Sequence, residues 1–248
     1  MEKEKRKGTI KFAIFISVII ISVVAVAIIM LKYAIEGETN MPFILSKITI
    51  VSTAEGLPKQ QEEHKWALDL VQNNDIYFQI DRNPNFKKQE KIEKIIIENF
   101  KTIEKPKVGM LKKYMPNSTE GRLFTYSDAY LVNTKLEYMG ASKDSNQDLQ
   151  IGNQGGMLVL RYTNTQIGEY VSDEEGEIVH DGTLLQKIGI TEQDLRCKVS
   201  FDFIIQLENK AFKTTVLLEL PSGNILENGT TSMEKTDLGD LVFKRISR

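Results

Sequence analysis

His180 and Asp181 are the neighbouring side chains whose chemistry most suggests an enzyme, because an imidazole beside a carboxylate can act as a general base. Adjacent residues of a strand point to opposite faces, however, and the sequence contains no Gly-x-Ser-x-Gly nucleophile elbow. The stretch from His180 to Thr183 therefore favours an ordinary turn built around Asp-Gly, and we assign no catalytic residue.

The single cysteine and the two histidines restrict thiol and metal chemistry. Cys197 follows the same alternating apolar pattern as Val199 and Phe201, which favours a buried, unreactive thiol over a nucleophile. One cysteine excludes an internal disulfide, and with His64 and His180 it supplies too few ligands for a Cys/His zinc site. We therefore predict neither a metal site nor a bound cofactor.

An acidic segment between residues 166 and 182 is the predicted partner-binding segment, because long polar loops are often functional. We expect it to be mostly irregular. Its carboxylates could supply oxygen ligands for calcium, but the spacing D-x-D-x-D-G of an EF-hand loop is missing, which favours a solvated acidic loop. The candidate residues for contact with a partner are Glu169, Asp173, Glu174, Glu175, Glu177, His180 and Asp181.

Two adjacent glycines, Gly155 and Gly156, stand directly before the apolar run 157–162. Such a pair in front of a strand indicates backbone with positive φ or a close approach of another segment. A phosphate-binding loop would need a wider glycine pattern followed by a helix. The glycines are therefore predicted to have a structural role.

The elements that position these residues begin with a predicted transmembrane helix at residues 12–31, from Phe12 to Leu31. Only two serines interrupt this 20-residue run, which at about 1.5 Å per residue spans roughly 30 Å, the thickness of a bilayer's hydrocarbon core. Basic residues predominate before it, which predicts a cytoplasmic tail at residues 1–11. A cleaved signal peptide is the alternative, but its apolar core is shorter, so we predict a retained signal-anchor of a single-pass protein.

Formal charge differs between the two sides of this helix. Residues 1–32 contain 6 basic and 2 acidic side chains (+4), whereas residues 33–248 contain 26 basic and 32 acidic side chains (−6). A mildly acidic domain has no basic footprint for nucleic acid, so nucleic acid is not an expected partner. We expect a linker at residues 32–41 and an extracytoplasmic, strand-rich domain at residues 42–248, held at the cell membrane.

Alternation of apolar and polar residues predicts strands through most of the outer domain. Asn73 and Asn74 separate two alternating runs, 66–70 and 76–80, and favour a turn, so these runs are predicted to form a hairpin. Further strands are predicted at residues 43–53, 108–114, 134–139, 157–162, 197–207, 212–220 and 241–246.

One long amphipathic helix is predicted at residues 84–103. Asn83 is a suitable N-cap, Pro84 suits the first helical position, and apolar residues from Ile92 to Ile103 recur at helical spacing. The predicted fold is therefore an N-terminal transmembrane helix followed by an α+β or mainly-β domain, with an antiparallel sheet or sandwich and this helix packed across it.

Three stretches carry a resemblance to known sequences: the run from Asn40 to Gly56, the stretch from Asn153 to Gly156, and Gly182-Thr-Leu-Leu. Together they resemble a group of uncharacterised single-pass membrane proteins of low-GC Gram-positive bacteria, over most of the chain. That group has no known activity. The resemblance therefore implies a bacterial membrane location and assigns no reaction and no site residue.

The favoured functional hypothesis is a non-enzymatic interaction or structural module of the cell envelope, which contacts an envelope protein partner through its sheet edges or loops. The alternative is an envelope enzyme that acts on cell-wall or lipid material through carboxylates brought together by the fold. A one-helix receptor is disfavoured, because a tail of 11 residues leaves no room for a cytoplasmic output domain.

Overall fold

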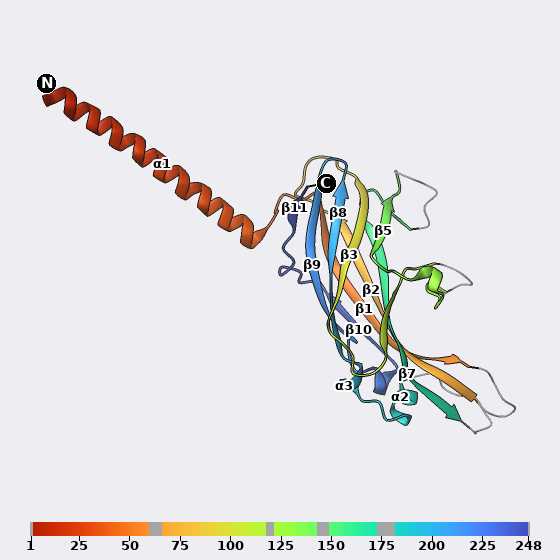
Figure 1. The fold of residues 1–248 in the computed structure, drawn as a ribbon. Coiled ribbons are helices and arrows are strands. Elements are labelled where there is room, and N and C mark those ends of the chain that lie inside the picture. Colours follow the sequence, from red (N-terminus) through yellow and green to blue (C-terminus); the bar gives the residue numbers. More distant parts are fainter. Residues whose placement is uncertain (1, 60–65, 118–121, 143–148, 173–181, 248) are drawn as a thin grey trace.

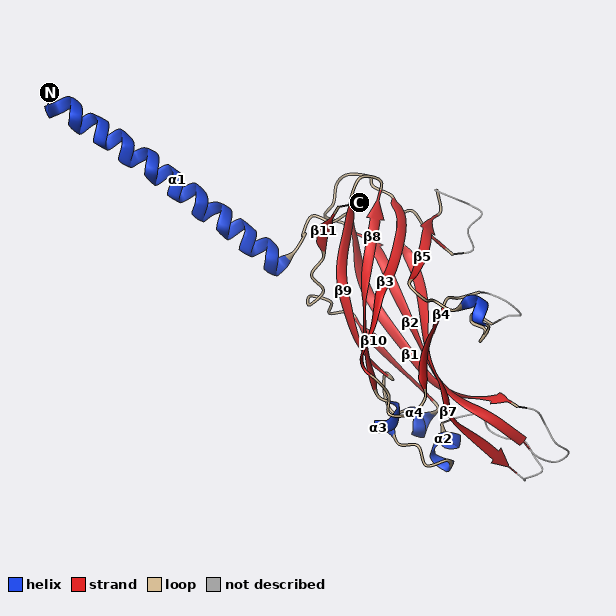
Figure 2. Ribbon diagram, viewed as in Figure 1, coloured by secondary structure: helices blue, strands red, loops and turns tan. Residues whose placement is uncertain are grey.

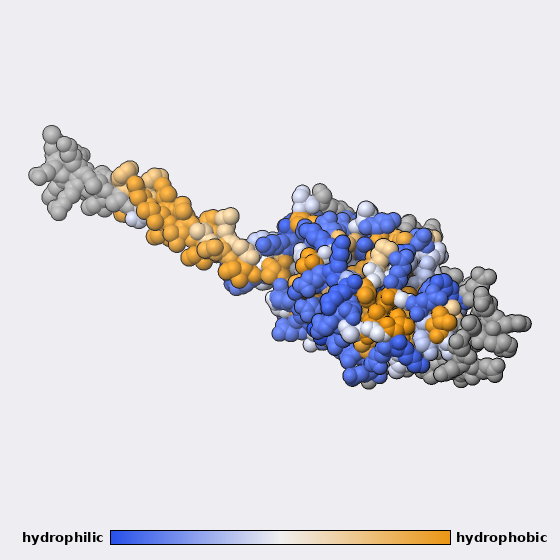
Figure 3. Space-filling model, turned by 60° about the horizontal axis from the view of Figure 1, so that its bottom comes forward, coloured by the Kyte–Doolittle hydropathy of each residue, from blue (hydrophilic) through white to orange (hydrophobic). Residues whose placement is uncertain are grey.

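The computed structural model describes residues 2–59, 66–117, 122–142, 149–172 and 182–247. A long helix, α1 (Glu2–Glu36), leads into a β-rich domain (Figure 1). Within α1, the span Ile14–Glu36 is long and apolar enough to cross a membrane, and none of it is buried against the rest of the protein. Figure 3 shows this apolar helix ending where the hydrophilic surface of the domain begins. The apolar run predicted at residues 12–31 therefore forms a helix.

Two sheets form the domain and pack face to face as a sandwich (Figure 2). The five-stranded sheet is fully antiparallel, with the order β10-β1-β2-β7-β4. Its strands are β1 (Phe43–Pro58), β2 (Trp66–Arg82), β4 (Met110–Tyr114), β7 (Gly156–Ser172) and β10 (Thr230–Lys235).

The six-stranded sheet has the order β11-β9-β8-β3-β5-β6, and only its β5–β6 pair is parallel. Its strands are β3 (Ile92–Glu104), β5 (Lys135–Gly140), β6 (Gln150–Ile151), β8 (Cys197–Leu207), β9 (Ala211–Leu220) and β11 (Lys244–Ile246). The predicted antiparallel, mostly-β architecture is therefore confirmed, and the strands predicted at 197–207 and 212–220 match β8 and β9 closely.

Aromatic side chains fill the centre of the core between the sheets. Phe78 of β2 meets two phenylalanines of β8, with ring centroids 5.8 Å from Phe201 in an edge-to-face arrangement and 5.2 Å from Phe203. All three are essentially fully buried. Both strands alternate, so that every second side chain enters this core and the others face outward.

The predicted long helix at residues 84–103 is wrong, because this segment contains a turn followed by the strand β3. Asn83 caps a turn instead of a helix, because its Oδ1 accepts a hydrogen bond from the Asn85 N–H. Ile95 and Ile97 alternate into the core, whereas Ile103 is 53% exposed. Three irregularities in the pairing with β8, one of them around Asn99 (φ 55°), shift the alternation so that apolar residues recur at a spacing that resembles a helix.

The predicted turn at Asn73-Asn74 is also wrong. Both residues lie inside β2, which is one continuous strand, and both are buried. Hydrogen bonds to β1, to β7 and to Tyr126, which lies between β4 and β5, satisfy their amides, so polar residues that usually mark a turn instead occupy a sheet interior. The alternating runs 66–70 and 76–80 therefore belong to a single strand that pairs with β1 over nearly its whole length.

Short helices close the end of the sandwich opposite α1, which we call the far end (Figure 2). These are α2 (Thr183–Lys187), α3 (Glu192–Leu195) and α4 (Ile225–Asn228). They bury a second apolar cluster against β1, β2 and β7. Residues 166–172, predicted to be irregular, are the last part of β7, which reaches this end.

The other end, which we call the anchor end, is tied to α1. The Glu38 N–H donates to the Phe243 carbonyl at 2.7 Å, and the Arg245 N–H donates to the Tyr33 hydroxyl at 2.9 Å. The segment around β11 therefore lies beside the last turn of α1 (Figure 1).

Substitution of Phe78 by alanine tests this core. Because Phe78 bridges both sheets, we expect Phe78→Ala to lower the free energy of unfolding by about 3–5 kcal/mol. Denaturation of the full chain in detergent, followed by near-UV circular dichroism, measures this change. Met157 is 61% exposed, so Met157→Ala should change stability by less than about 0.5 kcal/mol. Equal effects of the two variants would contradict the packing described above.

Candidate functional site

One of the seven predicted partner-binding residues lies in the described part of the chain. Glu169 is on β7 near the far end, and its Oε2 accepts a hydrogen bond from Lys59 Nζ at 2.7 Å. The other six, Asp173, Glu174, Glu175, Glu177, His180 and Asp181, fall outside the described residues. The acidic partner-binding segment and the turn at His180-Asp181 therefore stay predictions.

Cys197 and the glycine pair adopt the structures that their sequence context predicts. Cys197 begins β8 with only 5% of its surface exposed, and burial raises the pKa of its thiol to about 12. It is therefore protonated and unreactive at neutral pH. Gly155 and Gly156 both have positive φ, and a strand follows them instead of the helix that a phosphate-binding loop requires.

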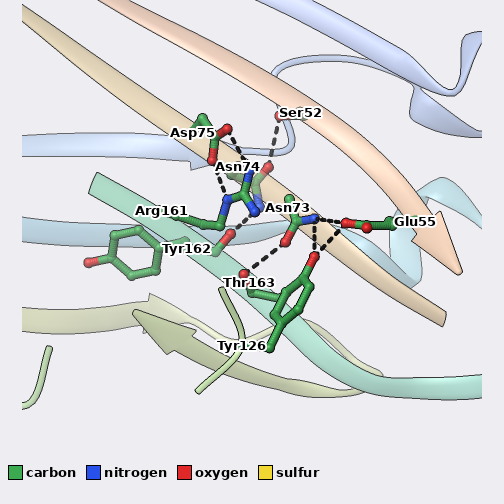
Figure 4. Close-up of polar contacts among 9 residues, drawn as sticks. All are labelled: Ser52, Glu55, Asn73, Asn74, Asp75, Tyr126, Arg161, Tyr162 and Thr163. Carbon is green, nitrogen blue, oxygen red and sulfur yellow. Dashed lines mark hydrogen bonds and ion pairs between the residues drawn. The ribbon is translucent and has the colours of Figure 1, made fainter. Parts of the chain in front are cut away.

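A polar cluster crosses the middle of β1, β2 and β7 (Figure 4). Its outer half lies on the face of the five-stranded sheet that points away from the core, because its members alternate with core residues along each strand. The segment between β4 and β5 covers this face and contributes a tyrosine. The residues of the outer half are Glu55, Asn73, Asp75, Tyr126, Arg161 and Thr163.

Asn73 is the centre of the outer half. Its Oδ1 accepts from the Thr163 hydroxyl at 2.8 Å. Its Nδ2 donates to Glu55 Oε2 at 3.1 Å and to the Tyr126 hydroxyl at 2.8 Å. The Tyr126 hydroxyl in turn donates to Glu55 Oε2 at 2.5 Å. One asparagine thus connects three strands and the covering segment.

Arg161 forms the strongest interaction of the cluster. Its Nε and Nη2 donate to the two carboxylate oxygens of Asp75, at 2.5 and 2.8 Å, in the bidentate geometry that favours arginine over lysine. Both side chains are about 15% exposed. The guanidinium also lies over the Phe124 ring, 4.2 Å from its centroid. The ion pair therefore joins β2 to β7, and the contact with Phe124 holds the covering segment on the sheet.

The inner half of the cluster lies inside the sandwich. The Ser52 hydroxyl donates to Asn74 Oδ1 at 2.8 Å and accepts from the Ser222 N–H at 2.8 Å. Asn74 Nδ2 donates to the Tyr162 carbonyl at 3.3 Å. This row of polar contacts separates the main core from the apolar cluster at the far end. It also joins the five-stranded sheet to the turn that follows β9.

A small pocket of about 250 Å³ opens on the outer half of the cluster. Burial, and then the carboxylate of Glu55, raise the pKa of Tyr126, so its hydroxyl stays protonated and acts as a hydrogen-bond donor. Burial lowers the pKa of Arg161, but the hydrogen bonds and charge of Asp75 outweigh this effect and the net pKa is raised. The pocket is lined by Glu55, Arg122, Leu123, Phe124, Tyr126 and Arg161.

The chemistry that this pocket offers is binding by hydrogen bonds and charge. Asp75 faces Arg161 instead of the pocket, and one oxygen of Glu55 already accepts two hydrogen bonds. Arg122 is exposed at the rim and forms no ion pair with the described residues. Sequence reasoning missed this site. The available signal was a polar triplet, Asn73 to Asp75, inside an otherwise alternating apolar run.

A larger groove of about 790 Å³ lies between β10, an edge strand of the five-stranded sheet, and the part of β9 that extends beyond the short edge strand β11. β11 pairs with β9 only at Ala211–Lys213, so residues 214–220 have no strand on that side among the described residues. Leu217 (49% exposed) and Met233 (40% exposed) face the groove from β9 and β10. Its rim carries charged side chains of both signs: Glu104, Lys105, Lys107, Glu192, Arg196, Lys198, Glu219 and Lys235.

Comparisons with protein-family models, curated proteins and solved structures find no match to this chain.

A double-mutant cycle on Asp75 and Arg161 tests the polar cluster. Removing either partner leaves a largely buried charge, so Asp75→Ala and Arg161→Ala should each lower the free energy of unfolding by about 2–4 kcal/mol. The double variant should lose less than the sum, with a coupling energy of about 1–3 kcal/mol.

The matched control for this cycle is the exposed pair Lys47–Glu234, with side chains 39% and 58% exposed. We expect a coupling energy below about 1 kcal/mol for this pair. A coupling between Asp75 and Arg161 no larger than that of the control would show that the cluster does not hold the sheet together.

Proposed function

We propose that the protein is a membrane-tethered, extracytoplasmic and non-enzymatic binding module of the cell envelope, which accepts an extended strand of a partner protein at the free edge of β9. The observation that carries this proposal is the edge at residues 214–220, with which no other strand of the described residues pairs, together with the groove beside it. The anchor is α1, whose apolar span would cross the membrane with residues 1–11 inside.

An unpaired strand edge presents backbone N–H and C=O groups that another extended chain can bind. The fold already uses this edge once, because β11 adds to β9 in antiparallel orientation at Ala211–Lys213. A partner strand would lie in line with β11 and pair with β9 at residues 214–220, toward the far end. Pockets beside such an edge supply specificity, and the groove offers the exposed side chains of Leu217 and Met233 for this purpose.

Geometry disfavours a second copy of this chain as the occupant. β9 runs from the anchor end, where Ala211 pairs with β11, to the far end at Leu220. A two-fold symmetric pairing of β9 with itself is antiparallel, so the anchor ends of the two copies would point in opposite directions. Two copies held upright in one bilayer cannot pair in this way. The proposed occupant is therefore a strand from a different protein.

The polar cluster supports binding over catalysis. Its acidic and basic groups satisfy one another, which favours a rigid surface over a free general base. The pocket on the outer face would then be a second contact for the same partner or for a neighbouring envelope component.

The anchor and its direction can be tested in bacterial cells. We expect the full chain to remain in the membrane pellet after carbonate washing, with a C-terminal tag digested by external protease and an N-terminal tag protected. Val23→Arg/Val24→Arg should release the chain, because each arginine at the centre of a membrane span costs about 2.5–3.5 kcal/mol. Val23→Leu/Val24→Leu is the control and should be retained. Protease digestion of the N-terminal tag from outside would contradict the proposed direction.

The free edge can be tested with a photo-crosslinking residue at Thr215, which is exposed on β9. In intact membranes we expect an adduct with a different protein. Adding Leu217→Lys, which places a charge on the edge, should reduce the adduct about tenfold, as charged side chains block strand addition. Met157→Lys, at an exposed apolar site on β7, should leave it unchanged. An adduct between two copies of this chain, or equal adducts in both lysine variants, would contradict the proposal.

A further inference from the structure

The anchor end carries positive charge although residues 33–248 as a whole have a formal charge of −6. Five exposed basic side chains gather there, on the segment between β2 and β3 and on β11. We call them the basic collar: Lys87, Lys88, Lys91, Lys244 and Arg245.

Backbone contacts place both parts of the collar beside the end of α1. The segment between β2 and β3 begins at Asn83, whose N–H donates to the Pro42 carbonyl at 2.9 Å and whose Nδ2 donates to the Met41 carbonyl at 2.8 Å. Met41 follows α1 by only a few residues. Arg245 lies against α1 directly, through the hydrogen bond of its N–H to the Tyr33 hydroxyl. In Figure 1 the segment between β2 and β3 arches over this end of the sandwich.

None of the five collar side chains forms an ion pair with the described residues. Nearby acidic groups have other partners. Glu90 pairs with Lys210 at 3.0 Å, Glu36 with Lys32 at 3.7 Å, and Asp81 accepts from Ser46 and Gln79. The five collar charges therefore lie at the surface without a direct ion-pair partner among the described residues.

We infer that the basic collar docks the anchor end of the sandwich on anionic phospholipid headgroups of the same bilayer that α1 crosses. This inference rests on the proposed membrane tether. The headgroup region extends only about 5–8 Å beyond the hydrocarbon core, and charges interact within a Debye length of about 8–10 Å at physiological salt, so only basic residues at this end can take part. Because α1 already holds the domain at the surface, even a weak attraction fixes its orientation. Docking sets the sandwich upright, with the far end away from the membrane.

The test uses the full chain in lipid nanodiscs, with a donor dye on Asn209→Cys in the exposed β8–β9 turn and an acceptor on lipid headgroups. Cys197 is buried and does not compete for the dye. We expect energy transfer to be about twofold higher in discs containing phosphatidylglycerol than in discs of phosphatidylcholine alone. This difference should disappear in 0.5 M NaCl, roughly the concentration at which the Debye length falls below 5 Å.

Charge reversal supplies the matched pair of variants. Lys87→Glu/Lys88→Glu/Lys91→Glu should abolish the lipid dependence, whereas Lys101→Glu/Lys105→Glu/Lys187→Glu, the same change of charge on the far half of β3, just beyond it and on α2, should preserve it. Inorganic phosphate at matched ionic strength separates two sources of phosphate. If phosphate lowers the lipid-dependent difference in energy transfer no more than NaCl does, docking on the bilayer is supported. If phosphate lowers that difference more than NaCl does, the inference is overturned in favour of a site for soluble phosphate.

Failure of the tether and failure of the collar give different results. If the chain does not co-elute with nanodiscs, the proposed membrane anchor fails. If it co-elutes and energy transfer is the same in both lipids, or is lost equally in both triple variants, the inference about the basic collar is overturned while the anchor stands.

Discussion

The polar cluster across β1, β2 and β7 is the constraint on which the rest of the domain depends. Asn73 and Asn74 lie buried in the central strand of the five-stranded sheet, where their hydrogen bonds offset the cost of removing their amides from water. Shifting β2 by one residue would place Asp75 in the core and expose Asn74, so the hydrogen bonds specify one register. That register fixes the two apolar faces of the sheet, the covering segment with Tyr126, and the pocket between them.

The two ends of the sandwich are built differently as a consequence. On the far-end side of the cluster, short helices bury an apolar patch that the two sheets leave uncovered. On the anchor-end side, the chain segment around β11 covers the edge of the core with Leu238, Leu241 and Phe243 and contacts α1. The free edge of β9 begins where this closure stops. The proposed partner site and the proposed membrane contact therefore lie at different positions along β9, the membrane contact near its start and the partner site toward its end.

Sequence reasoning succeeded where local pattern and tertiary environment agree. The helix α1 contains a continuous apolar run, β8 and β9 alternate between apolar and polar residues, and the buried thiol of Cys197 follows from its place in the alternation of β8. It failed at Asn73-Asn74 and at residues 84–103, because hydrogen bonds from distant strands and irregular pairing at Asn99 override local preference. Arg161 and Asp75 are 86 residues apart, so neither local spacing nor composition could pair them.

The pairing of β1 with β10 also has a consequence for how the domain is made. The first strand of the sandwich pairs on its outer side with residues 230–235, and β9 pairs with β11 at residues 244–246. Neither sheet can be completed before these residues have been synthesised, and contacts as distant in sequence as that of β1 with β10 form slowly. Until then β1 and β9 each have an edge open to other extended chains, so a nascent copy needs protection at the strand edge that we propose as the partner site of the mature protein.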